Sequence, residues 1–189
     1  MIVIAGPPGS GKSTAFPVSS FGVASFDADD RAAELNKGSD VGITNTIRHQ
    51  VNREFEAFVA GRIGRGESFA IETILRSHVT FEQARLAKTV GFEVEMRYMA
   101  LADFRMHLER VKARADAGGH SASEPALRSI HDASLSNLPQ AVVEVDQLWV
   151  YDNTTLGGPP WPIMEAKAGR IVFLEDPPPQ WLATAFVWV

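Results

Sequence analysis

Short apolar runs alternate along this chain with longer segments in which apolar residues recur every three or four positions. The runs predict strands, and the helical spacing predicts amphipathic helices. We expect strands over residues 1–5, 22–26, 68–72, 92–100 and 147–151, and helices over 43–63, 77–90, 103–115 and 124–138, besides a short one that begins near residue 11. Strands that alternate with helices favour a parallel sheet between helix layers. The pattern therefore predicts one α/β domain over residues 1–189.

The first apolar run leads directly into a glycine-rich stretch. It reads Gly6-Pro7-Pro8-Gly9-Ser10-Gly11-Lys12-Ser13-Thr14, the G-x-x-x-x-G-K-[ST] pattern of a phosphate-binding loop, or P-loop. A buried strand before the loop and a helix after it are the context that this motif requires. The loop's backbone N–H groups would surround a phosphate, Lys12 would reach the β- and γ-phosphates, and the Ser13 hydroxyl would ligate Mg²⁺. The sequence therefore predicts a nucleoside triphosphate site in a P-loop NTPase fold.

Carboxylates follow the second predicted strand, in the segment Asp27-Ala28-Asp29-Asp30-Arg31. Ligands collect at the carboxyl ends of parallel strands, so this segment would face the P-loop. Transfer of a γ-phosphoryl group to a hydroxyl benefits from a carboxylate that accepts the hydroxyl proton. We expect Asp29 to be that base. The alternative is an acidic loop that caps the helix starting near Arg31.

A second carboxylate ends the third predicted strand, in Phe69-Ala70-Ile71-Glu72-Thr73. A charged residue directly after buried strand residues needs a partner. We expect Glu72 to hold Mg²⁺ through water or to bind an acceptor hydroxyl, although it could simply begin the next loop. Arg76 lies four residues later and either pairs with Glu72 or contacts substrate.

Two arginines, Arg110 and Arg114, lie one turn apart on a predicted helix and so share a face. Guanidinium groups suit phosphate oxygens because their donors form a rigid fork. With Gly118-Gly119 as a hinge, residues 103–138 would form a lid that closes over a triphosphate. A solvated basic helix face is the alternative.

Composition excludes several classes of function. The 189 residues are 45% hydrophobic, carry a net charge of −5 and include no cysteine, which excludes disulfides and thiol chemistry. The chain shows no Lys/Arg block and no apolar run of eighteen residues, so we expect neither a nucleic-acid partner nor a membrane span. The first strand begins at once, without a signal segment, which predicts a cytoplasmic protein. Residues 156–189 form an extension with one added strand, 170–174, and an apolar end that needs burial.

Seven segments, taken in order, resemble the zeta-toxin family and its small single-domain relatives. They are the P-loop, Phe26 to Arg31, Phe69 to Thr73, Arg110-Val111-x-x-Arg114, Gly118-Gly119-His120, Ser134-Leu135-x-Asn137-Leu138 and Tyr151-Asp152-Asn153-Thr154. The resemblance covers roughly residues 1 to 155. It implies a kinase-type P-loop fold, in which a parallel five-stranded sheet lies between helix layers under a helical lid.

The resemblance also implies an activity. Characterised zeta toxins use ATP and Mg²⁺ to phosphorylate a sugar hydroxyl of UDP-N-acetylglucosamine, and many are held inactive by a small antitoxin. The resemblance assigns the phosphate and metal roles to Lys12 and Ser13, the base to Asp29, the substrate side to Glu72 and Thr73, the lid contacts to Arg110 and Arg114, and the nucleotide-base edge to Asn153. The segment from Glu72 to Arg76 departs from the small polar run of the relatives, so the acceptor could differ. Together with the residue-based arguments above, the predicted groups are the nucleotide-binding residues Gly6, Pro8, Gly9, Ser10, Gly11, Lys12, Ser13, Thr14 and Asn153; the catalytic residues Asp29, Lys12, Arg110 and Arg114; the acceptor-binding residues Asp29, Arg31, Glu72, Thr73 and Arg76; and the metal-binding residues Ser13 and Glu72.

Three alternatives remain open from the sequence. The chain could be an ATPase or ATP-driven switch without a small-molecule acceptor. It could act chiefly through a protein partner, with its apolar C-terminal stretch as a docking surface. A kinase for another metabolite, such as an antibiotic hydroxyl, is the nearest rival to a nucleotide-sugar kinase.

Overall fold

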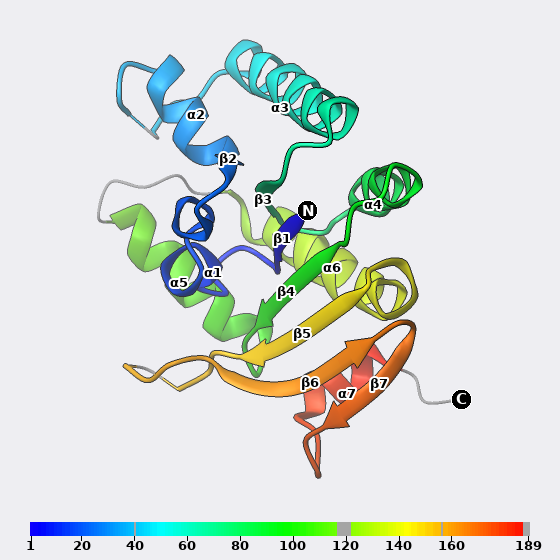
Figure 1. The fold of residues 1–189 in the computed structure, drawn as a ribbon. Helices are drawn as coiled ribbons and strands as arrows, with labels where there is room; N and C mark the ends of the chain where they lie inside the picture. The colour runs from blue at the N-terminus through cyan, green and yellow to red at the C-terminus, as the bar shows by residue number, and fades with distance from the viewer. Residues whose placement is uncertain (40, 117–121, 156, 187–189) are drawn as a thin grey trace.

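The computed structural model describes residues 1–39, 41–116, 122–155 and 157–186. Its described strands form one seven-stranded sheet in the order β2-β3-β1-β4-β5-β6-β7 (Figure 1). The strands are β1 Ile2–Ala5, β2 Ala24–Phe26, β3 Phe69–Thr73, β4 Glu95–Ala100, β5 Gln147–Asp152, β6 Trp161–Lys167 and β7 Arg170–Leu174. The first five strands are parallel to one another, and β6 and β7 add to the β5 edge in antiparallel orientation. The carboxyl end of β1, where the P-loop starts, therefore lies between the ends of β3 and β4.

Helices connect the parallel strands. They are α1 Lys12–Ala15, α2 Ala28–Leu35, α3 Asn45–Arg65, α4 Val79–Thr89, α5 Phe104–Asp116, α6 Glu124–Glu144 and α7 Gln180–Ala185, with the 3₁₀ helix η1 Val18–Phe21 after α1. Local signals set several of their ends. The Asp27 side chain caps α2, the Thr44 hydroxyl caps α3, and Gly66 ends α3 in the left-handed conformation, with φ 64°. Because Pro17 follows so closely, α1 has a single turn.

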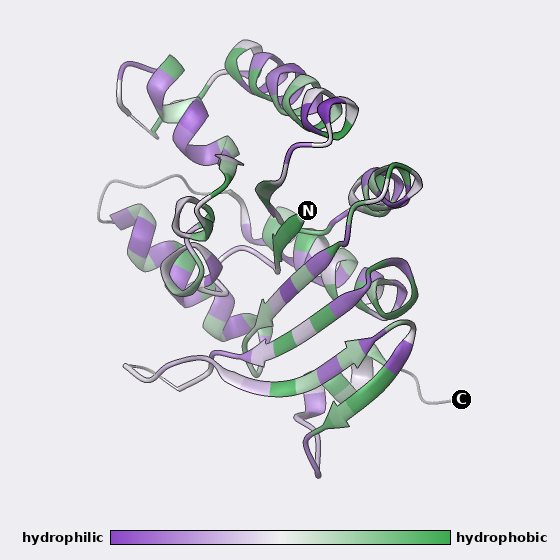
Figure 2. Ribbon diagram, in the orientation of Figure 1, coloured by the Kyte–Doolittle hydropathy of each residue, from purple (hydrophilic) through white to green (hydrophobic). Residues whose placement is uncertain are grey.

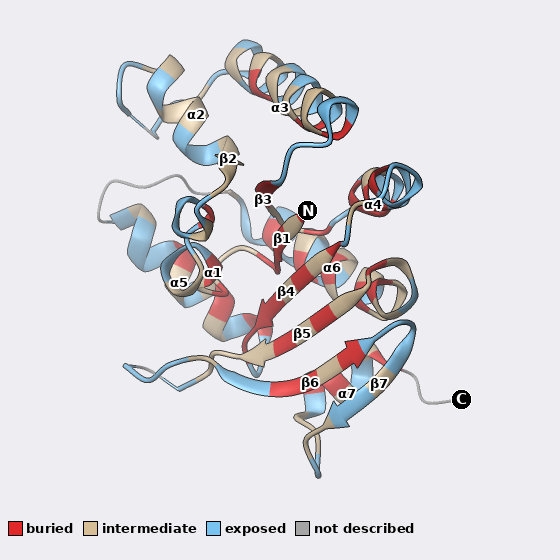
Figure 3. Cartoon of the chain, in the orientation of Figure 1, coloured by how far each residue is buried: buried red, intermediate tan, exposed pale blue. Residues whose placement is uncertain are grey.

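The two faces of the sheet are covered differently. The main core packs α3, α4, α6 and α7 against one face, around fully buried side chains such as Phe69, Met96 and Leu148. On the other face η1 lies over β1, β2 and β3, where Val18 packs against Ile4, and its last residue, Phe21, reaches the Arg97 side chain on β4. In Figure 3 the central strands β1, β3 and β4 are mostly coloured as buried. The sheet thus holds its loop-bearing strands rigidly.

The structure confirms the five predicted parallel strands and the predicted strand at β7, but it adds β6. Prolines at positions 159, 160 and 162 indicated turns there. Pro162 nevertheless lies in β6, beside a register irregularity in β5 between Val150 and Tyr151, and the part of β6 that pairs with β7 begins only at Met164. A missing N–H is tolerated at such a site because no ladder bond depends on it.

Helix α6 also runs further than the sequence indicated. Its expected end at Leu138 was set by the proline that follows, yet the helix continues through Pro139 to Glu144. Leu138 and Ala141 are fully buried in the core on either side of the proline, so packing keeps the segment helical. The expected hinge at residues 118–119, the neighbouring residue 120 and the end of the C-terminal stretch at 187–189 lie outside the described residues.

The C-terminal extension belongs to the same sheet. Helix α7 lies behind β6 and β7 in Figure 1, and Trp181 and Leu182 bury themselves in the main core. Figure 2 shows that apolar residues continue along β7, at the edge of the sheet. None of the described helices combines the length and apolar character needed to cross a membrane.

Candidate active site

The P-loop is held in close contact with two segments behind it. Gly9 has φ 79° and Gly11 has φ 87°, both in the left-handed region that favours glycine. A Cβ atom on Gly9 would lie 2.5 Å from the His107 carbonyl oxygen, and one on Gly11 would lie 2.5 Å from Asn153 Nδ2. A side chain at either position would therefore both crowd a neighbouring atom and strain the backbone.

Asn153 anchors the loop from the end of β5. Its side-chain N–H donates to the Ser10 carbonyl over 2.8 Å, and its backbone N–H donates to the Ala100 carbonyl at the end of β4. Arg110 Nη2 donates to the Asn153 carbonyl over 2.8 Å. The sequence predicted Asn153 at the nucleotide and Arg110 on the lid. The structure brings both to the loop, where they are bonded to each other.

His107 on α5 anchors the loop a second time, and sequence reasoning missed this role. Its Nε2 accepts the Leu101 backbone N–H over 3.0 Å, so its Nδ1 carries the proton and donates to the Pro8 carbonyl, also over 3.0 Å. Burial lowers the pKa of His107 to about 4, and the nearby His131 acts in the same direction. The imidazole is therefore neutral at physiological pH and joins the lid helix to the P-loop. Its P-loop partner, Pro8, lies 99 positions away in the sequence, so no local pattern could have revealed the contact.

Lys12 and Glu72 form a nearly buried ion pair at the loop. Lys12 Nζ lies 3.2 Å from Glu72 Oε1, and the two side chains are 8% and 12% exposed. Glu72 Oε2 and the Ser10 hydroxyl are buried without a hydrogen-bond partner among the described residues. Buried polar atoms without a protein partner are usually satisfied by a bound ligand or by water. Glu72 pairs with Lys12, and no described ion pair joins it to Arg76, which is exposed.

The same residues fit a magnesium ion that is held mainly by a nucleotide. Ser13 is exposed at the start of α1, and Glu72 offers an unused carboxylate oxygen. The described residues include no group of three or more His, Asp or Glu that would hold a metal by themselves. Mg²⁺ typically takes only one or two protein ligands and completes its shell with phosphates and water. Ser13 and Glu72 would supply those protein oxygens.

A cavity of about 500 Å³ opens beside Ser13 and is closed on its other side by α2. Its lining comprises Ser13, Pro17, Val18, Ser19, Ser25, Phe26, Asp27, Asp30, Arg31 and Glu34. Asp27, Asp30 and Arg31 face it because positions i, i+3 and i+4 share one side of a helix. Asp29 and Asp30 are both exposed, but only Asp30 lines the cavity, since Asp29 lies about 100° around the helix from it.

The charged groups of the cavity influence one another. Partial burial raises the pKa of Asp30, and the carboxylates of Asp27, Asp29 and Glu34 raise it further. Asp27 Oδ1 accepts the backbone N–H groups of Asp29 and Asp30 over 2.9 and 3.2 Å, so the capping role that the sequence left open belongs to Asp27. Both Asp27 and Asp30 lie where a hydroxyl could approach Ser13 and the P-loop.

The remaining predicted residues are placed less favourably for contact with a ligand. Thr73 Oγ1 accepts the Leu75 N–H over 3.1 Å and lies 3.4 Å from Thr80 Oγ1. Leu75 is fully buried with φ 51°, and its carbonyl accepts a hydrogen bond from Asn137 Nδ2 over 2.9 Å. Thr73 therefore shapes the turn after β3. Arg114 is exposed on α5, one turn beyond the arginine that contacts Asn153.

No protein-family model and no curated protein sequence matches this chain. Its fold is similar to the crystal structure of AvrRxo1-ORF1:-ORF2 with ATP, with a TM-score of 0.69 and 15% identity over 95% of this chain and 63% of that one. It is also similar to a structure from the PezAT chromosomal toxin-antitoxin system of Streptococcus pneumoniae, with a TM-score of 0.58 and 18% identity over 80% of this chain and 66% of that one. This chain spans about two thirds or less of the length of either neighbour. The likenesses show that this chain shares the fold of these two proteins.

Proposed function

We propose that this protein is an ATP-dependent phosphotransferase that moves the γ-phosphoryl group of ATP to a hydroxyl of a small molecule. One observation carries the proposal: Ser13, at the end of the P-loop, lines the same cavity as Asp27 and Asp30. A nucleotide on the loop and a hydroxyl in the cavity would then meet at Ser13. In-line transfer needs this arrangement of donor, acceptor and base.

The roles of the residues follow from their positions. The P-loop amides and Lys12 would bind the phosphates, and Mg²⁺ held by Ser13 would neutralise charge on the β- and γ-oxygens. A triphosphate on the loop would attract Lys12 away from Glu72. The Glu72 carboxylate would then be free to bind a metal-bound water or the acceptor hydroxyl. Arg110, beside Gly11, would bind phosphate oxygens from the lid side.

For the base we propose a carboxylate of the cavity, Asp27 or Asp30, in place of the Asp29 assignment made from sequence. Asp30 has the more suitable chemistry, because its raised pKa makes it the better proton acceptor when ionised. Asp27 already uses one oxygen as the helix cap. The Asp27→Asn variant keeps that cap, since asparagine caps helices equally well.

The decisive experiment measures transfer from labelled ATP to a panel of hydroxyl compounds, with ATP affinity followed separately. Lys12→Ala should abolish nucleotide binding. Asp30→Asn should keep ATP affinity and lose transfer by about a hundredfold or more, whereas Asp29→Asn, the matched control on the exposed side of α2, should remain active. If only Asp29→Asn loses transfer, the sequence assignment is restored and the cavity is not the acceptor site.

A nucleotide sugar such as UDP-N-acetylglucosamine is the first acceptor to include, because the sequence resembles the zeta-toxin family. An acceptor-independent ATPase is the competing function. It predicts hydrolysis at the same rate with and without every compound of the panel, and a rate that Asp30→Asn leaves unchanged.

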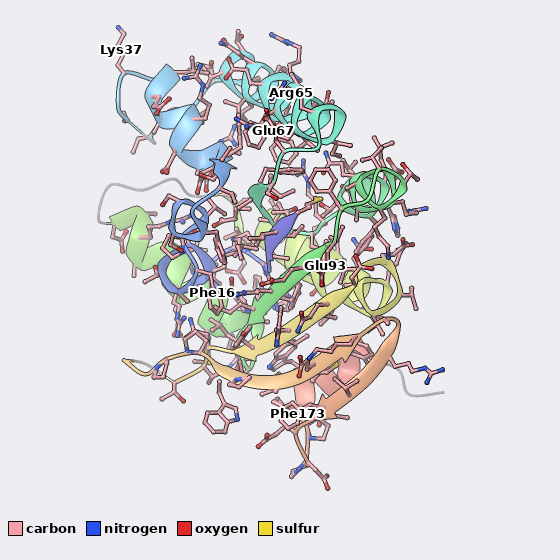
Figure 4. All side chains as sticks on the ribbon, viewed as in Figure 1. Phe16, Lys37, Arg65, Glu67, Glu93 and Phe173 are labelled. Atoms are coloured by element: carbon pink, nitrogen blue, oxygen red, sulfur yellow. The ribbon has the colours of Figure 1, made fainter. Side chains whose placement is uncertain are left out.

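A protein partner is the second proposal, and the open face of the sheet favours it. Figure 1 shows no described helix in front of β5, β6 and β7. On this face the Arg97 guanidinium lies 5.0 to 5.6 Å from the ring centroids of Phe16, Phe21 and Trp149. Phe16 and the exposed Phe173 are labelled in Figure 4. Phe16, Phe21 and Trp149 are half-buried, and a partly exposed aromatic surface of this kind is typical of an interface.

The structural neighbours point the same way, since one is a structure of AvrRxo1-ORF1 with -ORF2 and the other comes from a toxin-antitoxin system. Co-expression with any short reading frame that neighbours the gene tests the proposal. A partner that co-purifies with the wild type and is lost on Trp149→Ala would support an antitoxin-like role. Retention of the partner by that variant would place the interface elsewhere.

A further inference from the structure

The cavity beside Ser13 is lined by three carboxylates and one guanidinium. The acidic groups are Asp27, Asp30 and Glu34, and the basic one is Arg31. The rest of the lining is uncharged. The formal charge of the cavity wall is therefore negative before any ligand enters.

The Arg31 guanidinium does not offset this negative charge for a ligand, because carboxylates of the protein already bind it. Its Nε donates to Glu54 Oε2 over 2.6 Å, its Nη2 donates to Glu54 Oε1 over 3.4 Å, and its Nη1 donates to Glu34 Oε2 over 2.8 Å. Hydrogen bonds to these two carboxylates hold its pKa above the ordinary arginine value. A phosphate entering the cavity would have to displace two carboxylates from one guanidinium. No other cation belongs to the lining residues that the structure describes.

Asp30, in contrast, keeps its carboxylate available. In the described part of the chain no hydrogen bond or ion pair engages its side-chain oxygens, and only its backbone N–H is bonded, to Asp27. Its raised pKa reports partial burial and the repulsion of the neighbouring carboxylates. A positive group in the cavity would relieve that repulsion, and an anion would add to it.

We propose that the acceptor bound in this cavity is a hydroxyl compound that carries a protonated amino group and no phosphate, such as an amino sugar or an aminoglycoside. The inference rests on the proposed kinase function and names the substrate class of that same site. The amino group would lie against the second carboxylate oxygens of Asp27 and Glu34, so that Asp30 remains available to the acceptor hydroxyl. The volume of about 500 Å³ accommodates a compound of one to three sugar rings.

The test uses four compounds. Glucosamine differs from N-acetylglucosamine in carrying a free, protonated amino group, UDP-N-acetylglucosamine adds a uridine diphosphate, and kanamycin is a larger amine. Each is titrated into the 189-residue chain with Mg²⁺ and a non-hydrolysable ATP analogue, and each is assayed for transfer from labelled ATP. We expect the amines to bind at least about tenfold more tightly than N-acetylglucosamine at low salt, and the preference to shrink at about 500 mM KCl.

Two variants locate the effect. Glu34→Gln removes one carboxylate and releases Arg31, so KM for the amine should rise about threefold to tenfold while KM for ATP stays unchanged. Glu56→Gln, an exposed carboxylate on α3 outside the cavity lining, should leave both constants unaltered. An equal loss with both variants would show a general charge effect and overturn the assignment to the cavity.

The binding and transfer measurements separate the two proposals. Preferred binding of the amines without transfer to any compound would support the cavity chemistry and overturn the kinase function. Transfer to UDP-N-acetylglucosamine with no preference for the amines would support the kinase and overturn the acceptor class. Absence of both binding and transfer for every compound would overturn both.

Discussion

Acidification should loosen the protein through one buried imidazole, that of His107. Its neutral form bridges Pro8 in the P-loop and Leu101 after β4, and a proton on Nε2 would break the bond from the Leu101 N–H. The folded state holds the pKa of His107 at about 4, below the ordinary value of 6.5. The unfolded chain therefore takes up the proton first as pH falls, and stability declines between about pH 6.5 and about pH 4.

The magnitude follows from the difference between the two pKa values. Proton linkage for a single site with pKa about 4 folded and 6.5 unfolded gives a loss of about 2.5 kcal/mol between about pH 7.5 and about pH 4.5. This is a large part of the stability of an ordinary domain. Below about pH 4 the imidazole is protonated in both states and makes no further contribution.

Urea unfolding at a series of pH values, followed by far-ultraviolet circular dichroism, measures the effect. His107→Gln keeps a neutral polar group but cannot titrate, so it should cost about 1 to 2 kcal/mol at neutral pH and lose less stability than the wild type on acidification. His78→Gln, at an exposed histidine, is the control. If wild type and His107→Gln lose stability in parallel down to about pH 4.5, His107 titrates normally and the bridge is not formed as described.

Four further substitutions test the packing around the site. Asn153→Ala leaves the buried Ser10 carbonyl without its partner, so it should weaken the binding of a fluorescent ATP analogue about tenfold and lower the free energy of unfolding by about 1 to 3 kcal/mol. Gly9→Ala should abolish binding of the ATP analogue, because the new Cβ would lie 2.5 Å from a carbonyl oxygen. Gly64→Ala is the matched control, because nothing lies within 4 Å of a Cβ at that position. It should raise the free energy of unfolding by up to about 1 kcal/mol. Asn137→Ala leaves the Leu75 carbonyl without its partner and should lower the free energy of unfolding by about 1 to 3 kcal/mol in a urea titration.

The elements that the sequence predicted well are those whose signals are local. The P-loop is a contiguous motif, so its residues and the apolar run before it were enough to predict it. The parallel strands could be recognised in the sequence as apolar runs between segments of helical periodicity. Glu72 was placed at the loop for a similar reason, because the carboxyl ends of adjacent parallel strands meet at one edge of the sheet.

The features that the sequence did not reveal depend on the exact residue at which a helix begins, or on contacts between residues that lie far apart in the sequence. Choosing among Asp27, Asp29 and Asp30 required the first residue of α2, since a shift of one position turns a side chain by about 100°. The sequence expected that helix to start near Arg31, but it starts at Ala28. His107 could not be found because its partner Pro8 lies 99 positions away.

The short first helix explains why these distant contacts matter. In this chain α1 is one turn long, so few aligned peptide dipoles point at the phosphate site and little of the loop's geometry is fixed by helix propagation. The loop is instead fixed by His107 on α5 and Asn153 after β5, which hold the carbonyls of Pro8 and Ser10. Nucleotide affinity should therefore depend on His107, which holds the loop through the Pro8 carbonyl, as well as on the residues that bind phosphate. Any partner or ligand that moves α5 would change that affinity through the imidazole bridge.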